Sequence, residues 1–167
     1  VALKMVPARL AGDPEATRRL IEEARLTSRL RHRNIVQVID LGEVEGRHYI
    51  AMEYVDGLDL GKLLERLRPL HALPSPKVAS FITRELCEGL EHAHRATDAD
   101  DRPLRIVHRD VSPSNIIISY SGEVKLCDFG IAKATLSKVQ TKSGVIKGKV
   151  KYMSPEQALG RKLDHRS

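Results

Sequence analysis

No run of apolar residues in this sequence approaches the roughly 20 residues that a membrane-spanning helix needs, and no signal-peptide pattern opens the chain. Cysteine is scarce: Cys87 and Cys127 stand far apart and form no C-x-x-C pattern. Cysteines placed in this way argue against a zinc site and fit the reducing cytosol. We therefore expect no membrane segment in this stretch and a cytoplasmic location, although the parent protein could be anchored elsewhere in its chain.

A concentrated basic segment is also lacking. The net charge is +6, from 28 Lys and Arg against 22 Asp and Glu, but the basic residues are spread along the chain and often alternate with acids. A solvated basic surface explains this charge better than nucleic-acid binding does, so no nucleic-acid partner is expected. The 167 residues, of which 41% are hydrophobic and 30% charged, suffice for one soluble globular domain with a core.

The centre of the chain predicts a small hairpin with polar ends. Two apolar runs, residues 116–118 and 124–126, flank a Ser-Gly-Glu turn. Asp110 and Asn115 precede this hairpin and Asp128 follows it, and a hairpin brings its two ends together. We therefore expect these three side chains to converge. Two carboxylates and an amide form an oxygen-rich pocket that suits Mg²⁺ with a phosphate rather than a soft metal.

The residues around the hairpin read H-R-D-x-x-x-x-N from His108 to Asn115, followed by D-F-G from Asp128. This combination is the protein-kinase catalytic signature. The chain resembles the catalytic domain of a eukaryotic-like bacterial serine/threonine protein kinase. The resemblance implies an α+β, bilobal protein-kinase-like fold, in which residues 1–55 supply part of the β-rich N-lobe and the hinge, and residues 56–167 part of the helical C-lobe.

The same resemblance implies that the sequence is an internal fragment. It begins at the strand that follows the family's glycine-rich loop and stops soon after Ser154-Pro155-Glu156, which matches the family's A-P-E. We expect the parent domain to bind ATP and Mg²⁺ and to phosphorylate Ser and Thr hydroxyls of protein substrates. The isolated fragment should be inactive.

The family's catalytic roles can be carried over to the hairpin residues. Asp110 would orient the substrate hydroxyl, Asp128 would hold the bridging Mg²⁺, and Asn115 would hold the second metal ion. His108 and Phe129 are interpreted as packing residues.

A lysine interrupts the apolar run at residues 1–6, VALKMV. Lys4 is either an ordinary edge-strand residue or, as the family's V-A-x-K pattern implies, the lysine that grips the α- and β-phosphates. Asp-Pro-Glu at residues 13–15 then opens a helix. The family's glutamate that pairs with the lysine would be Glu23, with Glu22 as the alternative, and either could be a solvated helix charge.

Residues 35–41 and 48–54 read as two strands joined by a glycine-containing turn. By resemblance the second strand runs into the hinge between the lobes. The backbones of Glu53 and Val55 would then contact adenine, and Asp59 would reach the ribose. An ordinary strand end is the alternative interpretation.

Two helices are predicted after the hinge, at residues 60–67 and 78–95. The second should bury the apolar side chains of Phe81, Ile82, Leu86 and Leu90. Residues 96–105 are polar and acidic, which favours a solvated loop and leaves open a docking surface.

Two residues depart from the family pattern. Ser112 stands where the family has a lysine, two residues after the catalytic Asp, and Lys149 stands where it has a threonine. Our hypothesis is that the two groups have exchanged positions, so that Lys149 supplies the catalytic cation and Ser112 the hydroxyl. The alternatives are a pseudokinase that binds nucleotide or acts as a scaffold and, less favoured, a tyrosine kinase.

Residues 131–147 are rich in Lys, Ser and Thr and resemble an activation loop. Arg109, next to the catalytic Asp, suggests that a phosphate on this loop is bound. Thr141 and Ser143 are the favoured acceptors, ahead of Thr135 and Ser137.

Overall fold

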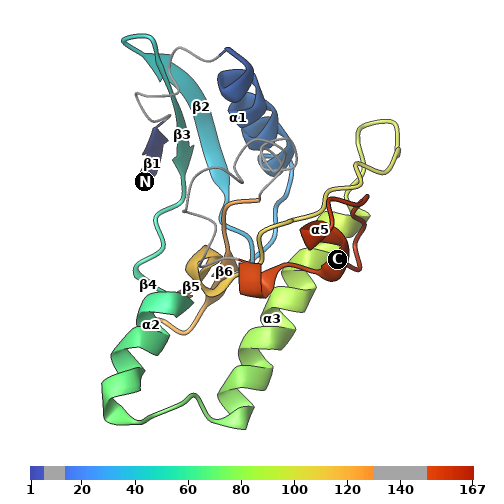
Figure 1. Cartoon of the computed structure of the whole chain (residues 1–167). Coiled ribbons are helices and arrows are strands. Elements are labelled where there is room, and N and C mark those ends of the chain that lie inside the picture. The colour runs from blue at the N-terminus through green and yellow to red at the C-terminus, as the bar shows by residue number, and fades with distance from the viewer. Residues whose placement is uncertain (6–13, 130–149) are drawn as a thin grey trace.

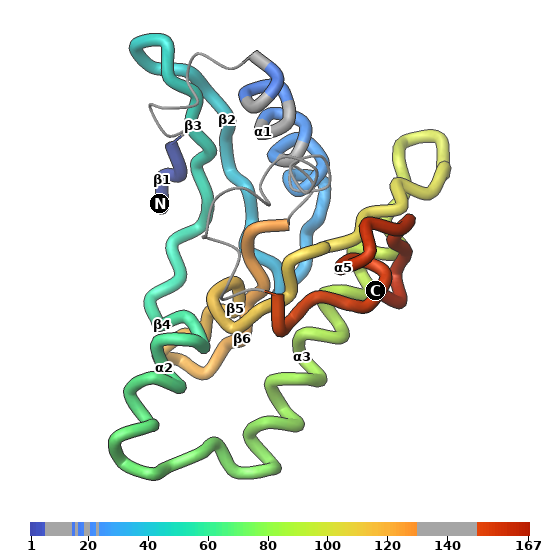
Figure 2. Tube along the Cα trace, viewed as in Figure 1, coloured from blue at the N-terminus to red at the C-terminus, as the bar shows by residue number. Residues whose placement is uncertain are grey.

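The structure is a computed structural model that describes residues 1–5, 14–129 and 150–167, apart from the side chains at positions 14, 16, 19, 20 and 23. It has two parts, one above the other in Figure 1: a sheet with one helix, and a larger part with most of the helices and a second small sheet. None of the helices within the described ranges is long and apolar enough to cross a membrane. Figure 2 shows the chain passing from the upper to the lower part between β3 and β4.

The upper sheet contains β1 (Ala2–Met5), β2 (Val38–Val44) and β3 (Arg47–Met52) in the order β1-β3-β2, with antiparallel pairing throughout. Glu45 and Gly46 form the two-residue turn between β2 and β3, and both have positive φ, 51° and 72°. Such a turn has the twist that a tight hairpin needs. The sheet therefore leaves β1, with Lys4, as one of its edges.

Helix α1 (Pro14–Thr27) lies beside this sheet (Figure 1). Ala24 packs in a buried cluster with Val38 and Ile50, and the small alanine side chain lets the helix approach the strands closely. The prediction of a helix opening near residue 14 is confirmed.

The lower sheet confirms the predicted hairpin. It contains β4 (Gly57–Asp59), β5 (Ile116–Ser119) and β6 (Val124–Leu126), and β5 pairs antiparallel with both neighbours. Gly57 is required in β4, because a Cβ at that position would collide with the carbonyl of Ile118. The hairpin ends next to the polar residues that precede and follow it.

The helices of the lower part begin at side-chain caps. Asp59 caps α2 (Leu60–Leu67), and Ser75 caps α3 (Pro76–Arg95), so α3 begins two residues earlier than predicted. Ser154 caps the short helix α5 (Pro155–Ala158). Short 3-10 turns lie at Arg68–Leu70, Pro113–Asn115 and Val150–Tyr152.

The main core lies between α3 and the β5–β6 hairpin. Its buried members are Leu30, Ile35, Ile82, Ala93, Ile106, Ile116, Val124, Leu126 and Phe129. Ile82 is in this core as predicted, and Leu86 and Leu90 pack against it. The prediction that Phe81 is a core residue is wrong, because its side chain is 42% exposed. The Arg84 guanidinium lies 5.3 Å from the Phe81 ring, so this aromatic residue is covered by a cation instead of the core.

The strand predicted at residues 35–41 is also partly wrong, because β2 begins only at Val38. Ile35 and Val36 are buried, and they leave the upper sheet to contact the lower one. The Val36 N–H donates to the Leu126 carbonyl at 2.9 Å, and the Leu126 N–H donates to the Asn34 carbonyl at 2.8 Å. A buried apolar run that joins two parts of a protein reads like a strand in the sequence.

Residues 96–105 project from the end of α3 (Figures 1 and 2). Most of them are exposed, which agrees with the predicted solvated loop. The Asp98 carboxylate accepts from the N–H groups of Asp100 and Arg102, so the loop has its own internal turn.

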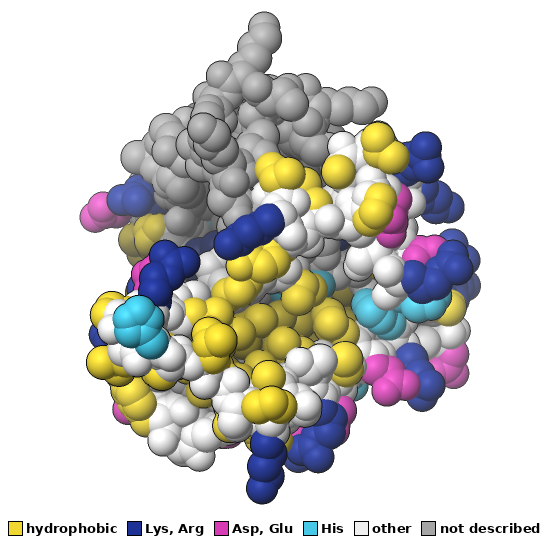
Figure 3. Space-filling model, turned by 60° about the horizontal axis from the view of Figure 1, so that its bottom comes forward, with side chains coloured by type: hydrophobic (Ala, Val, Ile, Leu, Met, Phe, Trp, Pro, Cys, Tyr) yellow, Lys and Arg dark blue, Asp and Glu magenta, His cyan; other side chains and the backbone are white. Residues whose placement is uncertain are grey.

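Apolar side chains gather at the centre of another face of the molecule, the one turned forward in Figure 3.

Candidate active site

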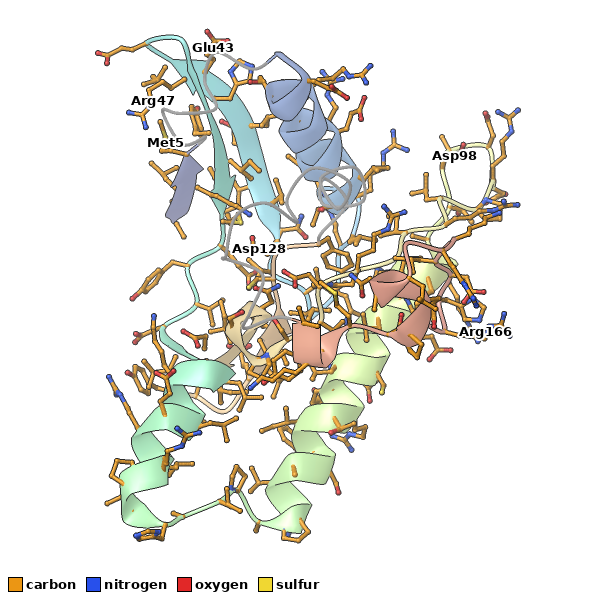
Figure 4. All side chains as sticks on the ribbon, viewed as in Figure 1. Met5, Glu43, Arg47, Asp98, Asp128 and Arg166 are labelled. Carbon is orange, nitrogen blue, oxygen red and sulfur yellow. The ribbon has the colours of Figure 1, made fainter. Side chains whose placement is uncertain are left out.

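Asp128 lies where the two parts of the protein come together (Figure 4), and Lys4 of β1 contacts it there. The Lys4 Nζ lies 2.6 Å from the Asp128 Oδ1, and both side chains are only partly exposed, 37% and 40%. Edge strand β1 positions the lysine, and the end of β6 positions the carboxylate. Lys4 is therefore on an edge strand and also contacts a predicted site residue 124 positions away in the sequence, while its role toward phosphates stays a prediction.

A small cavity of about 20 Å³ lies beside this ion pair. Its lining includes the two charged side chains together with Thr27, Val36, Val38, Met52, Cys127 and Phe129.

Asp110 and Asn115 also lie together, as the sequence predicts. The Asn115 Nδ2 donates to the backbone carbonyl and to the carboxylate Oδ2 of Asp110, each at 2.8 Å. Both amide hydrogens are thereby used, so the Asn115 Oδ1 points away from the carboxylate. The Ser114 hydroxyl donates to this oxygen at a long 3.4 Å. The Asn115 Oδ1 and the carboxylate of Asp128 are oxygen ligands of the kind that Mg²⁺ takes.

The segment with Asp110 is tied to the segment with Asp128. The Cys127 N–H donates to the Asn115 carbonyl at 2.9 Å. His108 is 1% exposed: its Nδ1 accepts from the Asp110 N–H at 3.2 Å, so its Nε2 carries the proton and donates to the Cys127 carbonyl at 3.1 Å. The His108 ring also packs 4.5 Å from the Phe129 ring, which agrees with the packing role predicted for both residues.

Two residues of the site have strained backbones. Arg109 has φ 64° and Asp128 has φ 57°, a region that is unfavourable for residues other than glycine. Such conformations persist only where surrounding contacts hold them. The Nε of Arg109 is buried and has no hydrogen-bond partner among the described residues.

Ser112 is buried, with 4% of its surface exposed. Its hydroxyl lies 3.1 Å from the Ser114 hydroxyl. Lys149 falls outside the described residues, as do the predicted acceptors Thr141 and Ser143. The exchange of Ser112 and Lys149 therefore stays a prediction.

Glu53, which was predicted to lie in the hinge, has structural partners that sequence reasoning missed. The Glu53 N–H donates to the Gln37 carbonyl at 2.9 Å, and its carboxylate lies 2.6 Å from the Nζ of Lys125. The sequence did contain a signal for this ion pair: Lys125 lies within the apolar strand β6, where a charged side chain needs a partner.

Asp59 is not simply free for a ribose. Its carboxylate accepts from the Lys62 N–H at 2.9 Å and lies 3.2 Å from the Lys62 Nζ. Although burial raises the pKa of Asp59, the hydrogen bonds from Lys62 outweigh it and leave the pKa below its usual value. This aspartate caps α2, whatever else it does.

The two glutamates considered for Lys4 differ. Glu22 is 55% exposed and lies 3.9 Å from Arg18, so it is a surface charge. The side chain of Glu23 lies outside the described residues, and its pairing with Lys4 stays a prediction.

A further contact involves Gln157 of α5. Its Nε2 donates to the Arg109 carbonyl at 2.7 Å and so connects α5 to the segment with Asp110. Nothing in the sequence around Gln157 singled it out.

The comparisons agree on one family. The family model described as the protein kinase domain matches residues 1–167. The chain is 44% identical to the tyrosine-protein kinase MasK of Myxococcus xanthus (strain DK1622), an alignment that covers 100% of this chain and 26% of that protein. It is 41% identical to the serine/threonine-protein kinase PrkC of Bacillus subtilis (strain 168), over 96% of this chain and 23% of that protein.

Solved structures agree as well. The PknI kinase domain of Mycobacterium tuberculosis matches 98% of this chain and 56% of that chain, with a TM-score of 0.69 and 31% identity. The expected bilobal α+β fold is thereby confirmed. The chain spans only about a quarter of the length of the two curated relatives.

Proposed function

Because this chain belongs to the protein kinase domain family, we propose that the full-length protein transfers the γ-phosphate of ATP to Ser and Thr hydroxyls of protein substrates. The observation that carries the proposal is the meeting of Lys4 with Asp128 and of Asn115 with Asp110 at one junction. Phosphoryl transfer needs positioning and charge neutralisation more than covalent chemistry, and these residues supply both.

Each residue has a proposed role. Asp128 and the Oδ1 of Asn115 would hold Mg²⁺, which neutralises charge on the phosphates when bound. Lys4, released from Asp128, would bind the α- and β-phosphates, oriented by Glu23. Asp110 would accept a hydrogen bond from the substrate hydroxyl and orient it for attack.

The nucleotide base is assigned to the hinge. Because the N–H of Glu53 already donates to Gln37, adenine would use the carbonyl of Glu53 and the backbone of Val55. Asp59 would approach the ribose from its capping position on α2.

Phosphoamino-acid analysis tests the acceptor. After incubation of the full-length protein with γ-labelled ATP, Mg²⁺ and a generic protein substrate, we expect label in phosphoserine and phosphothreonine. Label confined to phosphotyrosine would favour the tyrosine kinase reading, to which the name of the similar MasK protein points. Nucleotide binding without any transfer would indicate a pseudokinase, the reading that the missing lysine at Ser112 favours.

We predict that Lys149→Ala lowers kcat of the full-length protein by about a hundredfold, the usual effect of removing one donor to the transition state. In the exchange hypothesis, the Lys149 ammonium replaces the family lysine that Ser112 displaces. The double change Ser112→Lys with Lys149→Thr should restore activity. Full activity in Lys149→Ala would eliminate the exchange, and Lys151→Ala serves as a neighbouring control.

We also predict that autophosphorylation places phosphate on residues 131–147, with Thr141 and Ser143 favoured. The buried Nε of Arg109 lacks a partner among the described residues, and a phosphate would give its guanidinium a bidentate one. Mass spectrometry of the autophosphorylated protein checks this. Phosphate found only outside residues 131–147 would contradict it.

A further inference from the structure

We propose that Gln157 is a positioning residue for phosphoryl transfer: it fixes the peptide group that carries the catalytic Asp110. The inference rests on the proposed function, in which Asp110 orients the substrate hydroxyl. It assigns a role to a side chain that lies 48 positions away from the residue it contacts.

The contact itself is short. The Gln157 Nε2 lies 2.7 Å from the Arg109 carbonyl oxygen, at the near end of the usual range for such hydrogen bonds. Gln157 is only half-buried, so its amide could be hydrated instead. The side chain nevertheless reaches across to the backbone of the catalytic loop.

The base of this side chain is held in place. The Gln157 N–H donates to the Ser154 hydroxyl at 3.2 Å, and the Ala158 N–H donates to the Ser154 carbonyl at 3.0 Å. These two bonds set the first turn of α5. The Gln157 amide therefore extends from a fixed backbone, so it can restrain what it binds.

The restrained group is the peptide between Arg109 and Asp110. Gln157 holds its carbonyl, and the Nδ1 of His108 holds its N–H at 3.2 Å. Both polar ends of one planar unit are thus fixed, from opposite directions. A planar peptide held at both its carbonyl and its N–H resists rotation about its own axis, so the backbone that leads into Asp110 is restrained.

The residue that leads into this peptide, Arg109, has φ 64°. A non-glycine residue avoids this region unless other contacts compensate for the strain. Without the Gln157 bond, rotation of the peptide would change ψ of Arg109 and φ of Asp110 and would move the Asp110 carboxylate relative to Asn115. A small displacement of a reacting group is enough to slow a reaction strongly.

The arrangement also links α5 to the segment of residues 108–115, which carries Asp110. α5 follows the segment that resembles an activation loop, so any change that moves α5 acts on Asp110 through Gln157. His108 links the same peptide to Cys127, next to Asp128, from the other side.

The test compares Gln157→Met and Gln157→Glu in the full-length protein. Met keeps the length of the side chain but has no donor, and Glu keeps the shape but turns an acceptor toward the Arg109 carbonyl. We expect kcat to fall about tenfold for Met and further for Glu, with the KM for ATP unchanged. Amide hydrogen exchange in residues 108–112 should become faster in both variants, which reports on the loop independently of activity.

The matched control is Gln37→Met. The Gln37 Nε2 also donates to a backbone carbonyl, that of Val38 at 2.9 Å, but in the upper part of the protein. This variant should keep the wild-type kcat and the wild-type exchange in residues 108–112. A thermal melt of each variant identifies any that unfolds.

The outcomes distinguish failure of the positioning role of Gln157 from failure of the proposed kinase function. If Gln157→Met kept the wild-type kcat and the wild-type rate of amide hydrogen exchange in residues 108–112, the positioning role would be overturned. Methionine can fill the same space as glutamine, so such a result would mean that Gln157 only packs. A raised KM for ATP with unchanged kcat would overturn it as well. Failure of the wild-type protein to transfer phosphate would instead overturn the proposed function.

Discussion

Replacing Asp128 with alanine should reduce Mg²⁺- and ATP-dependent phosphoryl transfer by about a thousandfold or more, since losing the main anionic metal ligand removes several kcal/mol of charge stabilisation. The change also removes the partner 2.6 Å from the Lys4 ammonium. Both side chains are more than one-third exposed, so solvent screens the ion pair and its loss should affect folding little. Transfer assays and thermal melts on the full-length protein check these two expectations.

The backbone supplies a matched control for this variant. Asp101 has the same φ as Asp128, 57°, but lies in the projecting loop. Asp101→Ala therefore reproduces the conformational cost of alanine in the left-handed region without touching the site. It should retain wild-type activity, and Asp128→Asn, which tolerates this φ but lacks the charge, should not. Activity near wild type in Asp128→Asn would contradict the metal-binding role.

Replacing Asp110 with asparagine should lower kcat by about 10²- to 10⁴-fold, the usual contribution of a group that accepts a proton or orients a nucleophile. Nucleotide affinity should stay close to that of the wild type, because Asp110 acts on the substrate hydroxyl. The change is nearly isosteric, and its amide oxygen can still accept from Asn115 Nδ2, which lies 2.8 Å from the present carboxylate.

Steady-state kinetics and calorimetric titration with nucleotide measure the two effects separately. A control should exchange aspartate and asparagine away from the site without disturbing the core. Asn34→Asp does not meet this requirement, since Asn34 is buried and its amide donates to Glu85. Asp98→Asn in the projecting loop is preferable. Wild-type turnover in Asp110→Asn would remove Asp110 from its assigned role.

The local pattern around the hairpin allowed much of the site to be predicted. The alternation of apolar runs with a Ser-Gly-Glu turn specifies β5 and β6, and a hairpin must bring its ends together. That reasoning places Asp110 near Asn115 and both near the end of β6 from sequence alone. His108 and Phe129 were likewise interpreted as packing residues, and both are buried.

Errors arose where tertiary contacts decide the structure. Ile35 and Val36 have the composition of a strand, but they are buried by crossing between the two sheets. Phe81 fits the apolar periodicity of α3, yet it lies on a face that Arg84 covers. Periodicity reports which residues could share a face and not what packs against that face.

Other features had no local signal. The capping role of Asp59 on α2 was missed, because a capping residue and a ligand-binding residue look alike in sequence, and its contact with a ribose stays a prediction. Gln157 contacts Arg109 across 48 positions, and no pattern near either residue encodes that distance. Contacts between distant segments are set by the fold as a whole.

The most direct test of the central claim is a comparison of γ-labelled with α-labelled ATP in the full-length protein. We expect Mg²⁺-dependent incorporation of label into serine and threonine from the γ-position only, and its loss in Asp110→Asn. No incorporation from γ-labelled ATP by a folded, nucleotide-binding wild-type protein would contradict the claim that these residues form a phosphoryl-transfer site.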